Sequence, residues 1–387
     1  MLSRRLFARA GICVAAAAAI GGCSTAQTTS STISGTKLTI YASVPSTAGD
    51  VLDAEKLAFQ QAGDTVDKGH FRIVLKPLTA DSIKQIADNA RTADTDQTTV
   101  AYLGEVVPGM SEQSVPITNE LGILEVSPTD NALELTTPSP VVSDSPNTFY
   151  PSRSTYGYTF GRIAPSSRLE AADVVAEMRK LGVTKLYVAN DGSDYGRAIA
   201  HAVQADAGSS PSVTAGPPSA AKVAAAGADG LFYGGGSASG AAALFNSIAA
   251  SAPKAKLFAP SALDSAAFAS ALNSAAAPNV YVSSPGFLRS GLSTEGVAFE
   301  HSFAAAYGHA PASDAIFGFA AMKAILEALN TAGAAADDRT TVGDDFFSLS
   351  LGSSAVGPLK IGKDGDSNLT SIVFSHVRGG KLVPFAS

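Results

Sequence analysis

The sequence predicts an α/β protein made of two doubly wound units, each a parallel sheet covered by helices on both faces. Three observations support this fold class. Short apolar runs alternate with helical patterns along the chain, as they do in parallel α/β sheets. The 387 residues exceed the usual length of a single domain. Hydrophobic residues make up 45% of the chain and charged residues only 16%, which is enough apolar material for a large core.

Residues 1–22 have the pattern of a signal peptide. They hold three arginines and no acidic residue, and Gly11 to Ile20 is apolar. That run is about half of the roughly 20 residues that a membrane-spanning helix needs. Small residues lie directly before Cys23, which resembles the lipobox of bacterial lipoproteins. In a lipobox the cysteine thiol receives a diacylglyceryl group. The alternative is an ordinary secretory signal with an incidental cysteine.

The lipobox predicts an extracytoplasmic protein that is lipid-anchored to the bacterial cell membrane. Two acyl chains, at roughly 0.8 kcal/mol per buried methylene, hold a protein stably where one chain does not. Cys13 would be lost with the signal and Cys23 acylated, which leaves no cysteine for a disulfide or a metal site. Residues 23–35 are polar and predict a tether that does not pack.

The first unit begins with the apolar run Lys37 to Tyr41, which predicts a strand. Asp50 to Gln61 predicts a helix because Leu52, Leu57 and Ala58 fall on one helical face. The same patterns predict strands over 71–75, 99–103 and 122–126, and helices over 81–93 and 111–120.

The second unit follows a Pro/Ser-rich interruption, with a switch near Ala164. Strands are predicted over 185–189, 231–233 and 256–258, and helices over 168–181, 197–207, 241–251 and 313–329. Ligands of doubly wound sheets bind beyond the carboxyl ends of the strands. Candidate functional residues therefore lie in the loops that follow Ala42, Gly104, Val126, Asn190, Gly234 and Pro260.

Motifs for catalysis, cofactors and metals are weak. The glycine-rich stretch 233–240 departs from the dinucleotide fingerprint, and a tight strand-to-helix turn explains it better. Residues 364–368 mimic a calcium loop, but Leu369 replaces the required glycine, so a hairpin turn is expected. The five histidines have no carboxylate partners at metal-ligand spacing. The net charge of -7 argues against nucleic acid as a partner. We expect no enzyme, no cofactor and no metal site.

Several segments, in this order and spacing, carry a family resemblance. They include VAYLGE (100–105), SVPI (114–117), NELGILEVSP (119–128), FYPSR (149–153), TFGRIAP (159–165), NDGSDYG (190–196), APKAKLF (252–258) and GPLKI (357–361). Together they resemble the leucine/isoleucine/valine-binding protein family, the type I periplasmic substrate-binding lipoproteins of ABC transporters.

The resemblance implies two lobes joined by three crossovers, which close on a small-molecule ligand. It implies that lobe 1 is 36–163 plus 285–342, and that lobe 2 is 164–284 plus 343–387. It also implies ABC permease subunits as partners and membrane contact through the N-terminal lipid.

The resemblance also implies the ligand contacts. In the family, the loop after the third strand opens a helix and holds the ligand's carboxylate; here it contains Pro108, Gly109, Met110 and Ser111. The implied contacts elsewhere are Thr129, Asp130, Asn131, Tyr195 and Ser261. Ser111 is either a ligand donor or only a helix N-cap. Tyr195 either covers the ligand or caps its own lobe.

Two departures from the family pattern bear on the ligand. Pro108 replaces a serine and removes a hydroxyl and an N–H donor. In the family, the turn after 256–258 supplies an acid that binds the ligand's ammonium group. Here that turn offers only Ser261. Asp130 or Asp191, from neighbouring loops, could replace the missing acid. We therefore expect a pocket less acidic than an amino-acid site.

The leading function is a lipid-anchored solute-binding protein of an ABC transporter. The alternative is a ligand-sensing or scaffold receptor of the same fold without a transport role. A secreted hydrolase would need a nucleophile–base pair that the sequence does not place.

Overall fold

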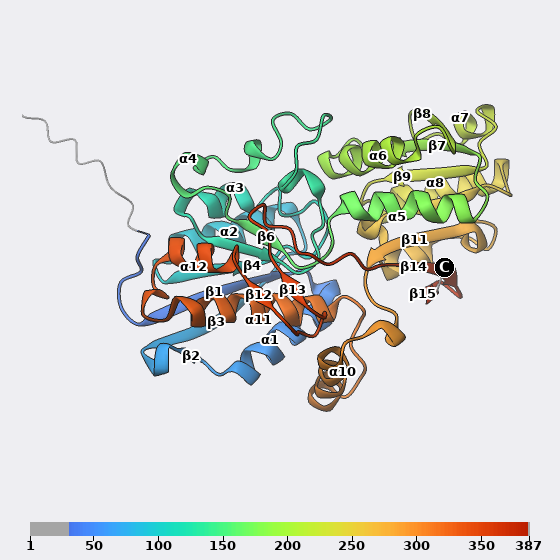
Figure 1. Cartoon of the computed structure of the whole chain (residues 1–387). Helices are drawn as coiled ribbons and strands as arrows, with labels where there is room; N and C mark the ends of the chain where they lie inside the picture. Colours follow the sequence, from blue (N-terminus) through green and yellow to red (C-terminus); the bar gives the residue numbers. More distant parts are fainter. Residues whose placement is uncertain (1–30, 386–387) are drawn as a thin grey trace, which may run out of the picture. The chain divides into compact units, whose positions relative to one another are not determined.

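A computed structural model of the chain describes residues 31–385, which form one compact unit. Two sheets organise this unit (Figure 1). The first has the order β2-β3-β1-β4-β5-β6. Its strands are β1 (Lys37–Val44), β2 (Thr65–Val66), β3 (Phe71–Thr79), β4 (Thr99–Leu103), β5 (Leu124–Ser127) and β6 (Phe160–Arg162). All of its strand pairs are parallel except β2 with β3.

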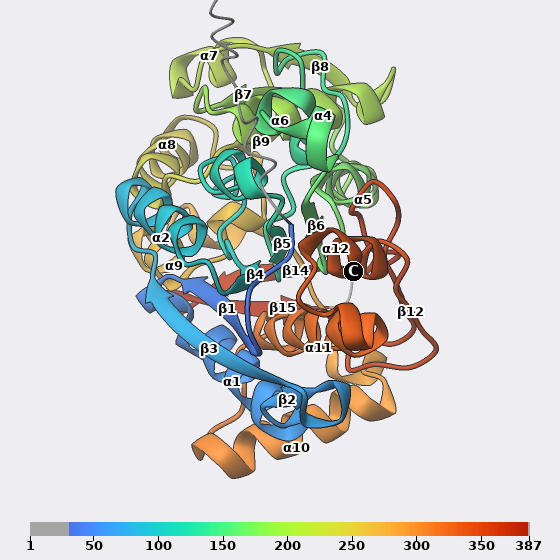
Figure 2. The same ribbon diagram turned by 90° about the vertical axis from the view of Figure 1, so that its left-hand side faces the viewer.

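The first sheet is covered on both faces because its strands bury alternate residues in opposite directions. In β1, Leu38, Ile40 and Ala42 pack into a cluster with helices α1, α11 and α12, whereas Tyr41 packs with α2 and α3. Figure 2 shows α2 and α11 on opposite sides of β1 and β4. The helices associated with this sheet are α1 (Gly49–Ala62), α2 (Ile83–Thr95), α3 (Val115–Thr118), α4 (Arg153–Tyr156), α10 (Thr294–Tyr307), α11 (Ala315–Ala332) and α12 (Arg339–Phe346).

The second sheet has the order β15-β14-β11-β10-β9-β7-β8. Its strands are β7 (Lys185–Asn190), β8 (Ser212–Ala215), β9 (Gly230–Gly234), β10 (Lys256–Ala259), β11 (Val280–Pro285), β14 (Ile372–Arg378) and β15 (Lys381–Phe385). The five strands from β7 to β11 run parallel, and β14 and β15 are antiparallel additions at one edge. A small separate hairpin pairs β12 (Ser350–Leu351) with β13 (Leu359–Lys360).

Helices also cover both faces of the second sheet. One buried cluster joins alternate strand residues to α5 (Ser167–Lys180) and α6 (Asp194–Ala207). The other joins the opposite residues to α8 (Ala238–Ser251) and α9 (Ala266–Ala271), with α7 (Ala220–Ala225) at its side. The chain passes between the two sheets three times: after β6, after β11 and after β13. The predicted α/β fold with two sheets and three crossovers is confirmed.

Helix α11 is the main core helix of the first sheet. The segment Ala315–Ala335 is long and apolar enough to cross a membrane by length and composition, but most of it is buried in the protein. Thirteen α11 residues are buried, and the helix packs on the sheet beside α1. Burial inside a protein core accounts for its apolar character.

The structure departs from the sequence prediction in two segments, the tether 23–35 and the C-terminal part of lobe 2, 343–387. Within the predicted tether 23–35, the described part begins at Ser31, and Ile33 is buried in the first core. The Ile33 N–H donates to the Asp337 carbonyl over 2.7 Å, so the segment is fixed before β1. Within 343–387, which was predicted to join lobe 2, only β14 and β15 join the second sheet. The apolar side chains of 346–369 pack into the first core instead.

The glycine-rich stretch and the segment that mimics a calcium loop both contain turns, as the sequence predicts. Residues 234–238 connect β9 to α8, with Ser237 as a side-chain N-cap that accepts from the Gly240 N–H over 3.3 Å. Residues 362–366 form a turn closed by the Gly362 N–H on the Asp366 carbonyl over 2.8 Å. Within residues 31–385, no group of three or more His, Cys, Asp or Glu side chains is arranged to hold a metal ion.

Candidate ligand-binding site

The predicted carboxylate-binding loop contacts a carboxylate that belongs to the chain itself. The carboxylate of Asp130 accepts hydrogen bonds from the backbone N–H groups of Gly109 and Ser111, each over 2.7 Å. It also accepts from the Ala132 N–H over 3.1 Å. Asp130 is fully buried; burial raises its pKa, and these N–H donors act against that shift. Two donors that the resemblance assigns to a ligand carboxylate are therefore occupied by Asp130.

Gly109 and Tyr195 meet in direct contact. Gly109 has φ +84°, and a Cβ at this position would lie 2.8 Å from the Tyr195 Cβ. Only glycine satisfies both the left-handed backbone and the close approach. Tyr195 is buried in the first turn of α6, and its hydroxyl lies 3.4 Å from the Ser261 Oγ. Tyr195 thus packs on the loop predicted to contact the ligand.

Glu170 of α5 supplies an acid at the turn after β10. Its Oε1 accepts from the Ser261 N–H and the Ser283 hydroxyl, each over 2.7 Å. Its Oε2 accepts from the Asn131 amide over 2.7 Å and from the Ser261 hydroxyl over 2.9 Å. Burial raises the pKa of Glu170, and the four donors oppose that shift. The expectation of a site poorer in acids is therefore wrong, because α5 provides the carboxyl that the turn lacks.

The remaining predicted residues lie in the same loops. The Ser111 Oγ accepts from the Glu105 N–H over 3.2 Å, and Ser114, not Ser111, precedes the first residue of α3. The Thr129 hydroxyl donates to the Val106 carbonyl over 2.6 Å. Pro108 and Met110 are partly exposed. The structure thus brings the predicted positions together, and most of their polar groups bond to one another.

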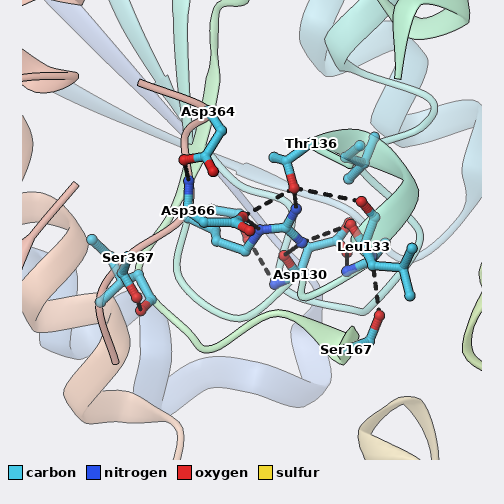
Figure 3. A network of polar contacts seen from close by, with 12 residues as sticks. Asp130, Leu133, Thr136, Ser167, Asp364, Asp366 and Ser367 are labelled. Carbon is cyan, nitrogen blue, oxygen red and sulfur yellow. Dashed lines mark hydrogen bonds and ion pairs between the residues drawn. The ribbon is translucent and has the colours of Figure 1, made fainter. Parts of the chain in front are cut away.

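Arg162, at the end of β6, connects three segments beside this site. Figure 3 shows Asp130, Thr136 and Asp366, which belong to the segments that it connects. The Arg162 side chain is fully buried. Its Nε donates to the Asp366 carboxylate over 2.8 Å, and its Nη2 donates to the Thr136 hydroxyl over 2.6 Å. Its Nη1 donates to the Ala132 carbonyl over 2.7 Å and to the Asp130 carbonyl over 3.3 Å. The planar guanidinium therefore fixes the chain after Asp130 against β6 and the turn that contains Asp366.

A cavity of about 480 Å³ opens at the carboxyl edge of the first sheet. We call it the edge cavity; it is lined by residues 45–47, by 80–83 with Ile86, and by 105–107 with Met110. These loops follow β1, β3 and β4, which are neighbours in the sheet. Of the nine predicted ligand-contact residues, Met110 lines this cavity.

Four functional candidates were missed by sequence reasoning. Glu105 lies in the edge cavity and Glu170 binds Ser261, as described above. Glu112 and Glu134 are neighbours, and burial raises the pKa of both. The charge of Glu134 raises the pKa of Glu112 further, whereas the contact with Glu112 lowers that of Glu134. Only Glu105 had a readable signal: it follows the buried strand β4, at an edge where ligands of such sheets bind.

Solved structures share this fold over most of the chain. A leucine-binding protein from Thermotoga maritima matches with a TM-score of 0.75 and 17% identity, over 90% of this chain and 98% of that one. An ABC transporter substrate-binding protein from Desulfitobacterium hafniense in complex with leucine gives 0.71 and 17%, over 90% and 100%. A solute-binding protein from R. palustris in complex with benzoate gives 0.67 and 17%, over 90% and 95%.

No protein-family model matches the sequence, and no curated protein matches it. The structural likeness, at identities of 14–18%, establishes the fold. The chain has the α/β fold of type I periplasmic binding proteins, the fold of the branched-chain amino acid substrate-binding components of ABC transporters.

Proposed function

We propose that the chain is a lipid-anchored extracytoplasmic solute-binding protein that delivers a small molecule to the permease subunits of an ABC transporter. The observation that carries the proposal is the fold likeness, which covers 90% of the chain and 95–100% of the three binding proteins named above, two of which are described as ABC transporter proteins. Those proteins are described as binding proteins, which supports binding rather than catalysis. Two are described in complex with leucine and with benzoate, so the fold accepts ligands of different chemistry.

The membrane anchor in this proposal is Cys23, which lies outside the described residues. Its support is the sequence: a basic start, a short apolar run and small residues before the cysteine. A diacylglyceryl group on Cys23 would hold the compact unit at the membrane surface, close to a permease.

Ligand binding between the two sheets would involve the predicted residues Gly109, Ser111, Asp130, Asn131 and Ser261. Their polar groups now bond to one another or to Glu170. A ligand that enters there has to replace these contacts, because a buried polar group left without a partner costs about 1–3 kcal/mol. We propose that opening of the contact between Asn131 and Ser261, 3.0 Å in this arrangement, precedes such binding.

A thermal-shift screen of the mature chain tests the proposed function. The panel contains amino acids, amides, small acids, amines and aromatic compounds. A solute present at 100 times its dissociation constant stabilises the folded state by about 2.7 kcal/mol, which is a readily measured shift. The proposal predicts at least one such compound class, and a panel without any stabilising solute contradicts it.

A receptor without a transport role is the second candidate, and one observation favours it. The Asp130 carboxylate accepts hydrogen bonds from the N–H groups of Gly109 and Ser111, as the carboxylate of a bound ligand would. The loop that contains Gly109 and Ser111 is therefore fixed without a solute. Cross-linking in cells that contain the intact protein separates the two functions. Cross-links to permease subunits support transport, and cross-links to other membrane proteins alone support the receptor.

A further inference from the structure

The edge cavity has the size and position of a ligand site. Its volume of about 480 Å³ lies within the range of roughly 300–1,000 Å³ that is typical of small-molecule pockets. It opens where three neighbouring strands, β1, β3 and β4, end. Ligands of open parallel sheets bind at this edge.

Most of the lining of the edge cavity is apolar. Pro45, Ala80, Ile86 and Val106 are buried in its wall. At its rim Ile83 is 57% exposed and Val107 is 36% exposed, and both are among the few large apolar side chains that the described chain leaves in water. An exposed apolar rim around a cavity favours a ligand with a hydrocarbon body, because binding removes that surface from water.

The polar lining of the edge cavity consists of Ser46, Thr47 and Ser82 and of two acidic residues. Glu105 and Asp81 line it, and its lining contains no Lys, Arg or His. Asp81 accepts from the Ser46 N–H over 2.7 Å and so joins the loops after β1 and β3. A ligand carboxylate would meet two acidic groups and no cation, whereas an ammonium group is electrostatically matched.

Glu105 is held in a fixed position by the strands beneath it. Its carboxyl accepts from the Tyr102 hydroxyl over 2.7 Å and from the Ser43 hydroxyl over 3.0 Å, and the residue is 1% exposed. The Asn89 amide donates to Ser43 over 3.0 Å and orients that hydroxyl. This second layer makes Glu105 a preorganised acceptor.

The charged groups that act on Glu105 are all acidic. The charge of Asp130 raises the pKa of Glu105, and Glu105 in turn raises the pKa values of Glu125 in β5 and Glu55 in α1. Burial is the largest cause that raises the pKa of Glu105 to about 8. The free protein therefore holds this carboxyl neutral at pH 7, and a bound cation would favour its charged form.

Resting on the proposed solute-binding function, we propose that the ligand of the edge cavity is an amine with an apolar body, whose ammonium group pairs with Glu105. A monoamine is preferred to an α-amino acid because no cation in the lining receives a carboxylate. Asp81, which is exposed at the rim, is the acidic group that the amine meets first on entry.

Calorimetry of the mature chain with three analogues that share a phenyl group and a two-carbon linker tests the ligand class. The probes are 2-phenylethylamine, 2-phenylethanol and 3-phenylpropionate. We expect the amine to bind at least tenfold more tightly than the other two. Because Glu105 has to lose its proton, the dissociation constant of the amine should be about 50-fold larger at pH 6 than at pH 8.

Variants then assign the effect to Glu105. Glu105→Gln should weaken amine binding at pH 8 at least tenfold and remove its pH dependence, whereas Glu120→Gln, at an exposed position, should change neither. Should Glu105→Gln fail to fold, Val107→Trp tests the same site by filling its rim. Unchanged amine binding in these variants, or an alcohol that binds as tightly as the amine, overturns the inference.

The outcomes also separate this inference from the proposed function. Binding of the alcohol or the acid in place of the amine refutes the amine site and leaves solute binding intact. Failure of these probes together with every solute in the thermal-shift panel refutes both.

Discussion

Replacement of Arg162 by methionine should strongly destabilise the folded state. The guanidinium is fully buried and donates to one carboxylate, one hydroxyl and two carbonyl oxygens. Methionine fills most of the same space but offers no donor, so Asp366 and the carbonyls of Asp130 and Ala132 each lose a hydrogen-bond donor.

The expected loss is about 3–5 kcal/mol, the range for breaking a buried ion pair from one side. The Asp366 side chain is 23% exposed, so water can solvate it in part, and we expect the lower half of that range. Arg162→Lys keeps the charge but not the planar fork, and should lose about 1–3 kcal/mol.

Arg168 provides a matched control within the same chain. It also pairs with an aspartate, Asp206, but its side chain is 48% exposed. Exposed pairs contribute about 0–1 kcal/mol, so Arg168→Met should change stability by less than 1 kcal/mol.

Urea unfolding at pH 7, followed by circular dichroism and evaluated with a common m value, measures both changes. Equal midpoints for Arg162→Met and Arg168→Met would refute the role assigned to Arg162 as the buried connection between three segments.

Three further predictions concern other parts of the chain. Cys23→Ala should release the protein from the membrane fraction, and unchanged retention contradicts acylation at that position. Gly109→Ala should lose about 1–3 kcal/mol more in urea unfolding than Gly63→Ala; both positions have φ near +85°, but only the Cβ at Gly109 would meet Tyr195. Free leucine should bind with a dissociation constant of roughly 1 mM or weaker in calorimetry, because Asp130 occupies two N–H donors. A low micromolar value would show that leucine displaces Asp130.

Strongly periodic segments were predictable from the sequence. The strand predicted over 99–103 is β4, Thr99–Leu103, and the long helix predicted over 313–329 is α11, Ala315–Ala332. The helix predicted over 111–120 is instead only α3, Val115–Thr118. The residues before Val115 are not part of a helix, and the Ser111 N–H there donates to the Asp130 carboxylate. Strand β6, three residues long, is too short for any periodic signal.

The loops that meet at the site were predictable because the carboxyl ends of parallel strands share an edge. The partners within those loops were not. Glu170 lies in the middle of a helical pattern and meets Ser261, 91 residues further along the chain. Asp130 turns back to Gly109, 21 residues earlier. Contacts of this kind depend on tertiary packing, which hydrophobic periodicity does not encode.

Competition between a solute and a side chain that fills the edge cavity tests both that this chain binds a small molecule and where it binds it: in the edge cavity, or at the predicted residues around Asp130 and Ser261. The measurement is the dissociation constant of the best solute from the thermal-shift panel, by calorimetry, for the wild type, Val107→Trp and Val297→Trp. The two valines are exposed to nearly the same extent, 36% and 38%, but only Val107 lines the cavity. We expect Val107→Trp to weaken binding at least tenfold and Val297→Trp to leave it unchanged. Equal affinities for all three proteins would contradict the assignment of the ligand to this cavity.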